Sequence, residues 1–169
     1  MKIKKGFSVF LVDKGKRFLE TLKAGLLIKF GKLMSVIEFG TGEACIQNMD
    51  THPDIIVPDY YLHSAEHFDA ADGIKTLKGM KSNFQNTAVI MLSGQDKMEV
   101  AADAVKYGAY NYIAKSESAF VCIQNAISNV LENISTTRKT VKYYKWNISF
   151  AAVLVLEVIM YLIWYSNAQ

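Results

Sequence analysis

Five short apolar runs alternate with segments of helical periodicity, and this alternation constrains the fold more than any other feature of the sequence. The runs lie at residues 7–12, 34–39, 54–57, 87–92 and 110–114. Their length and nearly continuous hydrophobicity are typical of strands that are buried on both faces of a sheet. Between them, apolar residues recur at three- and four-residue spacing, as on one face of a helix. The pattern predicts an α/β fold with a doubly wound five-stranded parallel sheet in a three-layer α/β/α sandwich.

The composition agrees with one folded domain. The chain has 169 residues, of which 51% are hydrophobic, and its net charge is +3, so a disordered chain is excluded. Two cysteines, Cys45 and Cys122, are too few for a disulfide framework or a zinc site. We expect both to be reduced thiols in a protein that faces the cytosol.

A second apolar feature stands near the C-terminus. Residues 148–165 contain only two side chains that are not apolar, Ser149 and Glu157. As a helix, residues 146–165 would be about 30 Å long, which matches the hydrocarbon core of a bilayer. Aromatic residues flank this stretch, and the segment before it is basic, which favours a cytoplasmic flank. We therefore predict a soluble domain over 1–135, a basic juxtamembrane linker over 136–146 and a transmembrane helix over 147–165. This makes a single-pass protein of the cell membrane with its domain in the cytoplasm.

Glu157 lies near the middle of the predicted span and leaves alternatives open. A central acid costs roughly 3 kcal/mol on insertion, and the surrounding Leu, Ile, Val and Phe side chains offset this cost. The glutamate could be protonated and face lipid or a second copy of the helix, which allows a homodimer. It could instead pair with a polar group on a partner span. A helix buried in an oligomer is the non-membrane alternative.

Four polar residues follow the predicted strands, where the chemistry of parallel sheets is usually found. They are Asp13, Asp59, Ser93 and Lys115. Asp59 could attack a phosphoryl group to form an acyl phosphate. A divalent cation on the carboxylates and the charge of Lys115 would neutralise the incoming phosphoryl oxygens, and Ser93 could donate a hydrogen bond to one of them. Neither a nucleophilic triad nor a glycine-rich phosphate loop is present in the sequence.

The order of these motifs resembles the receiver domain of two-component response regulators over about residues 5–135. The motifs are VFLVD at 9–13, PDIIVPD at 53–59, Asp72-Gly73, VIMLSG at 89–94 and GAYNYIAK at 108–115. The resemblance implies a flavodoxin-like fold, Mg²⁺ as cofactor and a histidine kinase or phosphotransfer protein as partner. By this resemblance Asp59 is the phospho-acceptor, Asp13 and Asp59 are metal ligands, Lys115 is the site lysine, and Ser93 and Tyr112 are the switch residues.

Two departures from the family pattern concern the site itself. Lys14 stands where the family carries a second acid, and Pro58 stands directly before Asp59. Asp13, Asp59 and Lys115 together give a charge of −1, and an inward Lys14 would bring it to zero. At about 4 Å a unit charge is worth up to about 4 kcal/mol in a partly wetted pocket, so Lys14 could weaken or abolish Mg²⁺ binding.

Two functions follow from these observations. The first is a membrane-tethered single-domain response regulator that accepts a phosphoryl group on Asp59 in a phosphorelay and signals through protein–protein contacts. The alternative is a phosphorylation-independent pseudo-receiver that acts as a membrane-anchored interaction module. Neither is an enzyme with an external substrate, although a receiver catalyses its own phosphorylation and dephosphorylation. A flavin-binding protein of the same topology is a third, weaker interpretation.

The remaining polar features are interpreted more simply. The basic residues before the apolar segment are better explained by anionic lipid than by nucleic acid, so no nucleic-acid partner is expected. They are Arg138, Lys139, Lys142 and Lys145. His63 and His67 have a spacing that could hold a metal on one helix face, but a solvated loop explains them as well.

Overall fold

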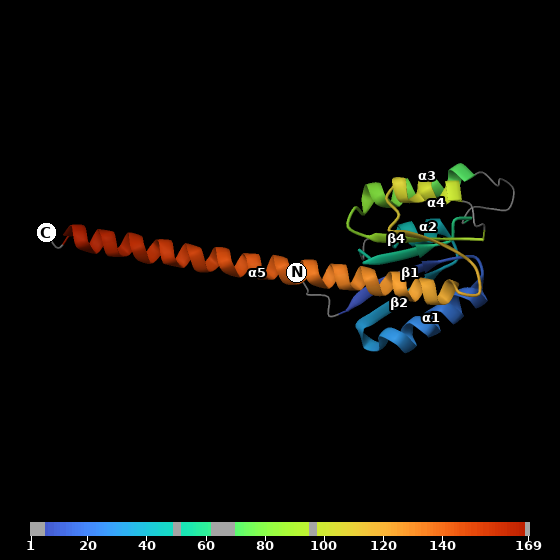
Figure 1. Cartoon of the computed structure of the whole chain (residues 1–169), viewed down its shortest axis with the longest axis horizontal. Coiled ribbons are helices and arrows are strands. Elements are labelled where there is room, and N and C mark those ends of the chain that lie inside the picture. The colour runs from blue at the N-terminus through green and yellow to red at the C-terminus, as the bar shows by residue number, and fades with distance from the viewer. Residues whose placement is uncertain (1–5, 49–51, 62–69, 95–97, 168–169) are drawn as a thin grey trace. The chain divides into compact units, whose positions relative to one another are not determined.

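The computed structural model describes residues 6–48, 52–61, 70–94 and 98–167, and strands alternate with helices along them (Figure 1). The elements are β1 (Phe7–Val12), α1 (Lys16–Phe30), η1 (Gly31–Leu33), β2 (Met34–Phe39), α2 (Gly42–Gln47), β3 (Ile55–Pro58), α3 (Ala70–Asn83), β4 (Ala88–Ser93), α4 (Met98–Lys106), β5 (Asn111–Ala114) and α5 (Ala119–Asn167). Each predicted strand is present, with its ends shifted by at most one residue.

The five strands form one parallel sheet in the order β2-β1-β3-β4-β5. The predicted flavodoxin-like sheet is thereby confirmed. Because β1 and β3 are neighbours, the residues that follow them, Asp13 and Asp59, come to the same edge of the sheet. The residues that follow β4 and β5 reach this edge as well, which concentrates the polar side chains of the domain there.

Helices cover both faces of the sheet. In Figure 1, α1 and the beginning of α5 lie on one face, and α2, α3 and α4 lie on the other. The rings of Phe18 in α1 and Phe120 in α5 are 5.3 Å apart, so these two helices pack against each other as well as against the sheet. On the other face, a buried cluster joins α3, β4 and α4 around Tyr60, Leu77 and Met91. The apolar stripes predicted for the helices are therefore the faces that the sheet buries.

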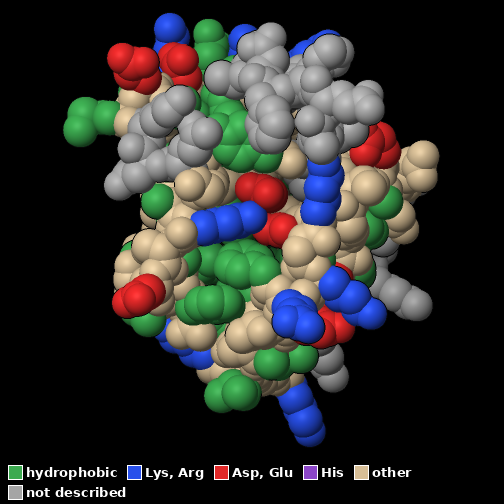
Figure 2. Space-filling view, turned by 90° about the vertical axis from the view of Figure 1, so that its right-hand side faces the viewer, with side chains coloured by type: hydrophobic (Ala, Val, Ile, Leu, Met, Phe, Trp, Pro, Cys, Tyr) green, Lys and Arg blue, Asp and Glu red, His purple; other side chains and the backbone are tan. Residues whose placement is uncertain are grey.

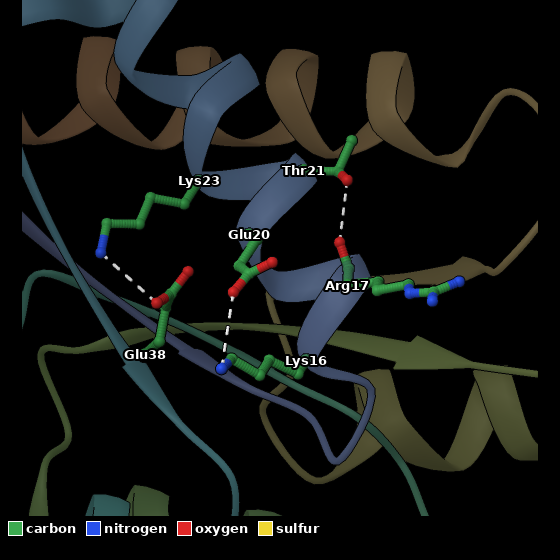
Figure 3. Close-up of polar contacts among 6 residues, drawn as sticks. All are labelled: Lys16, Arg17, Glu20, Thr21, Lys23 and Glu38. Carbon is green, nitrogen blue, oxygen red and sulfur yellow. Dashed lines mark hydrogen bonds and ion pairs between the residues drawn. The ribbon is translucent and has the colours of Figure 1, made fainter.

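Polar contacts add to the packing of α1 (Figure 3). Lys23 of α1 pairs with Glu38 of the edge strand β2 at 3.4 Å, and Lys16 pairs with Glu20 at 3.9 Å within the helix. The Thr21 hydroxyl donates to a carbonyl one turn earlier, at 2.8 Å. The Lys16–Glu20 pair is exposed and contributes less than about 1 kcal/mol. The Lys23–Glu38 pair is partly buried, and it links α1 to the edge strand in addition to the apolar face of the helix.

The chain divides into two compact units, Met1–Val130 and Leu131–Gln169. In the second unit α5 is helical through residues 136–146, for which a linker was predicted, and on to Asn167. Many of its large apolar side chains are exposed, among them Trp146, Ile148, Phe150, Leu154 and Leu156. In the described part of the chain, no helix combines the length and apolarity that crossing a membrane requires. The structure therefore does not support the transmembrane helix predicted over 147–165.

Candidate functional site

Backbone hydrogen bonds fix the residues at the carboxyl edge of the sheet. Asp59 N–H donates to the Val12 carbonyl at 2.7 Å, and Lys115 N–H donates to the Ser93 carbonyl at 2.7 Å. Asp13 N–H donates to a carbonyl at the end of β2, at 3.1 Å. Each bond extends the sheet one residue beyond its regular strand. The side chains of Asp13, Asp59 and Lys115 therefore start from backbone atoms that the sheet holds in place.

The Lys115 ammonium lies between the two carboxylates. Its Nζ atom is 2.5 Å from Asp13 Oδ2 and 3.0 Å from Asp59 Oδ2. Asp13 is 5% exposed. Figure 2 looks onto the right-hand side of Figure 1, and acidic and basic side chains lie next to one another near the centre of that view. Because all three groups are largely buried, removal of one of them leaves a charge that is poorly compensated.

The second oxygen atoms of the two carboxylates differ. Asp13 Oδ1 accepts a hydrogen bond from the Gly15 N–H at 2.7 Å. Asp59 Oδ1 is buried, and it has no hydrogen-bond partner among the described residues. An unpartnered buried acceptor costs about 1–3 kcal/mol, which is unusual enough to need an explanation. Asp59 Oδ1 is therefore the atom where a cation or a phosphoryl group would supply the missing interaction.

Pro58 fits the sheet because it is the last residue of β3. It pairs in register with Val12 of β1. A proline has no N–H to donate, and in a central strand this would remove a ladder bond. The next residue, Asp59, supplies a donor to the same Val12, so the connection between β1 and β3 continues up to the acceptor.

The two predicted switch residues lie on neighbouring strands. Ser93 ends β4 and is fully buried, and Tyr112 in β5 is half-buried. The Tyr112 ring centre lies 6.5 Å from that of Tyr60, at an interplanar angle of 76°. Tyr60 directly follows Asp59, so the aromatic contact leads from the acceptor to Tyr112.

Gly73 and Phe18 also shape the surroundings of the site. A Cβ atom at Gly73 would lie 2.6 Å from a ring carbon of Tyr60 and 2.8 Å from its carbonyl oxygen. Only glycine therefore lets α3 approach Tyr60 so closely.

The Lys115 Nζ atom lies 5.2 Å from the centre of the Phe18 ring, which is a cation–π contact. The sequence indicated Phe18 only as part of an apolar helix face, since spacing does not reveal which cation lies beside a ring.

Lys14, the predicted modifier of the site, is exposed. Solvent therefore screens its charge, and the cation that contacts both carboxylates is Lys115. His63 and His67 lie outside the described residues.

The carboxylates of Asp13 and Asp59 are candidate ligands for Mg²⁺. In the described part of the chain, no group of three or more His, Cys, Asp or Glu side chains is arranged to hold a metal ion. Mg²⁺ usually retains several waters and binds only one or two carboxylates. Asp13 and Asp59 provide such a pair, and the unpartnered Asp59 Oδ1 fits a hard cation. The donor set therefore fits Mg²⁺, with the Lys115 ammonium as a competitor for the same oxygens.

Comparisons with known proteins agree with this fold. The regulatory protein AtoC of Escherichia coli (strain K12) is 35% identical over 66 residues, which cover 39% of this chain and 13% of AtoC. The Francisella response regulator 1452 receiver domain superposes with a TM-score of 0.62 at 21% identity, over 76% of this chain and 99% of that one. The signal receiver domain of a DNA binding response regulator from Colwellia psychrerythraea 34H gives a TM-score of 0.64 at 20% identity, over 75% and 98%.

At these identities the structural likeness shows the fold alone, and the match to AtoC spans only a small part of that protein. The family is shown by its sequence profile, described as the response regulator receiver domain, which matches residues 9–127. The expected family is thereby confirmed: the chain belongs to the response regulator receiver domains of two-component signalling.

Proposed function

We propose that the chain is a membrane-tethered response regulator that accepts a phosphoryl group on Asp59 from a histidine kinase or phosphotransfer protein. The observation that carries this proposal is the buried, unpartnered Asp59 Oδ1 beside the Lys115 ammonium. Among the described residues, Glu38 Oε1 is also buried without a partner, but Glu38 pairs with Lys23 alone, whereas Lys115 joins Asp59 to a second carboxylate, Asp13, at the carboxyl edge of the sheet.

In the proposed reaction, a carboxylate oxygen of Asp59 attacks the phosphorus atom of the donor. The bond between phosphorus and the donor breaks, the donor leaves with the bonding electron pair, and an acyl phosphate remains on Asp59. Lys115, 3.0 Å from the acceptor, stabilises the negative charge on the phosphoryl oxygens. Mg²⁺ held by Asp13 and Asp59 would neutralise further negative charge on the phosphoryl oxygens. Phosphorylation and dephosphorylation are the only chemistry proposed for this site.

The alternative is a receiver that acts without phosphorylation. Its support is that Lys115 contacts both carboxylates, at 2.5 and 3.0 Å, which is a satisfactory ion-pair arrangement in itself. Such a protein would bind its partner through a surface that has a single conformation and does not change with phosphorylation.

The membrane tether is proposed from the apolar segment over 147–165. In α5, exposed apolar side chains occur at consecutive positions from Val153 to Leu156, and therefore on all sides of the helix. A helix that is apolar all round needs an apolar environment, and the basic residues before it favour an anionic lipid surface. Extraction of cell membranes with sodium carbonate tests this: release of the chain into the supernatant would refute the tether.

Phosphorylation is tested with the purified full chain, acetyl phosphate and Mg²⁺. We expect the mass of one phosphoryl group to be added and to be removed by hydroxylamine, which cleaves acyl phosphates. Asp59→Asn should abolish the adduct, whereas Glu20→Gln, at an exposed glutamate on α1, should leave it unchanged. Wild-type protein that gains no such adduct would support the phosphorylation-independent alternative.

A further inference from the structure

A groove of about 440 Å³ lies between α3 and α4, on the sheet face opposite to α1. Its floor is apolar and aromatic, and it is formed by Tyr60, Ile74, Val100 and Tyr107. Tyr60 is 2% exposed, and the other three are half-buried. The floor of the groove is thus a partly exposed apolar strip that a second protein surface could bury.

The two walls of the groove carry opposite charges. Lys75 and Lys78, three residues apart, project from α3, and Glu99 and Asp103, four residues apart, project from α4. All four residues are exposed. In the part of the chain that the structure describes, no ion pair joins one wall to the other. The Lys78 ammonium instead lies 3.8 Å from the centre of the Tyr107 ring.

We propose that this groove is an interface with a second copy of the chain. A two-fold axis that runs along the groove places α3 of each copy opposite α4 of the other. The lysine wall of one copy then faces the acidic wall of its partner twice, and the apolar floors meet in the middle. A surface with one basic and one acidic ridge is therefore complementary to itself, which an isologous dimer requires.

This arrangement differs from an association through the C-terminal apolar segment, which is neutral apart from Glu157. It also requires no phosphoryl group on Asp59, so it stands if the proposed phosphorylation fails. Charge substitutions in the walls separate the two modes of association, since they leave the C-terminal segment intact.

The test uses the full chain in dodecyl maltoside micelles, with the dimer fraction measured by sedimentation velocity. Lys75→Glu with Lys78→Glu makes both walls acidic, and Glu99→Lys with Asp103→Lys makes both walls basic. We expect each double variant alone to dimerise at least roughly tenfold more weakly than the wild type. An equimolar mixture of the two should restore the dimer, because opposite walls then face each other again.

The control is Lys29→Glu with Lys32→Glu, which changes the net charge as much as the lysine variant of the groove, at exposed lysines outside the groove. It should dimerise like the wild type. Thermal melting verifies that each variant is folded. The proposal is overturned if the wild type stays monomeric, which would leave the groove to a different protein. It is also overturned if the double variants dimerise as well as the wild type, or if mixing them restores nothing.

Discussion

Lys115 Nζ lies 2.5 Å from Asp13 Oδ2, which is closer than its distance of 3.0 Å to the acceptor Asp59. The lysine therefore binds a predicted metal ligand at least as closely as the residue whose phosphate it is expected to stabilise. The same ammonium can neutralise part of the negative charge of the two carboxylates in place of a metal ion, and it can compete with that metal ion for the carboxylate oxygens. Whether the metal binds therefore depends on whether Lys115 keeps its contact with Asp13.

Replacement of this lysine should separate its two effects. In Lys115→Gln the carboxylates lose their competing cation, so we expect the affinity for Mg²⁺ to rise roughly tenfold or more, as a unit charge in a partly wetted pocket allows. The phosphoryl adduct from acetyl phosphate should decrease at the same time. Isothermal titration calorimetry with Mg²⁺ measures the first effect. An affinity equal to that of the exposed-site control Lys32→Gln would show that Lys115 does not compete with the metal.

Two substitutions of Lys14 distinguish the effect of its charge on Mg²⁺ affinity from the effect of an added oxygen ligand. Because the residue is exposed, Lys14→Gln should change the Mg²⁺ affinity by less than about threefold. Lys14→Asp adds a carboxylate next to Asp13 and should raise the affinity by roughly tenfold, since another oxygen ligand becomes available. The same titrations measure both variants. A large gain from Lys14→Gln alone would mean that the Lys14 charge acts in the pocket.

The sequence predicted the sheet well, because buried parallel strands carry a strong apolar signal and polar residues mark their ends. Strand boundaries were harder to predict. Asp54 was expected to begin β3, whereas the regular strand begins at Ile55. The Asp54 backbone still bonds to both neighbouring strands, because its N–H donates to the Ser8 carbonyl at 2.9 Å and its carbonyl accepts from the Ala88 N–H at 3.0 Å, so the difference is one of assignment at a strand end.

The composition of the site could be predicted, but its internal contacts could not. Topology brings Asp13, Asp59 and Lys115 to one edge of the sheet, whereas the rotamer of the lysine decides that it contacts both carboxylates. The role of Gly73 was also hidden, because it depends on the path of Tyr60 in space and not on any local motif. Residues 136–146, predicted only as a basic linker, are helical within α5, and the Lys and Arg residues among them are good helix formers.

The two thiols should react differently. Cys45 is fully buried, and burial raises the pKa of its thiol from 9.0 to about 12, whereas Cys122 is exposed. Since the thiolate is the reactive form, the native protein at pH 8 should react with Ellman's reagent at one thiol and the urea-unfolded chain at two. In Cys122→Ser, the native protein should react at none. Rapid labelling of that variant in the absence of urea would contradict the buried position of Cys45.

Two glycines of α3 should respond with opposite sign to the same substitution. Gly73→Ala places a methyl group 2.6 Å from the Tyr60 ring, so we expect it to lower the free energy of unfolding by roughly 1–3 kcal/mol. At Gly79 a Cβ atom would meet nothing within 4 Å, and Gly79→Ala should raise the free energy of unfolding by about 0.5–1 kcal/mol through helix propensity. Urea denaturation measures both. Equal effects would show that α3 does not rest on Tyr60.

Tyr60 should carry the signal from the acceptor to Tyr112. Its N–H donates to the Leu92 carbonyl at 2.6 Å, and its ring meets that of Tyr112 edge-on. In wild type and in Tyr60→Phe, beryllofluoride with Mg²⁺ should shift the NMR signals of the Tyr112 ring. In Tyr60→Leu the ring contact is lost, so beryllofluoride should still shift the amide of Asp59 but leave Tyr112 unchanged. A full Tyr112 response in Tyr60→Leu would show that the switch bypasses Tyr60.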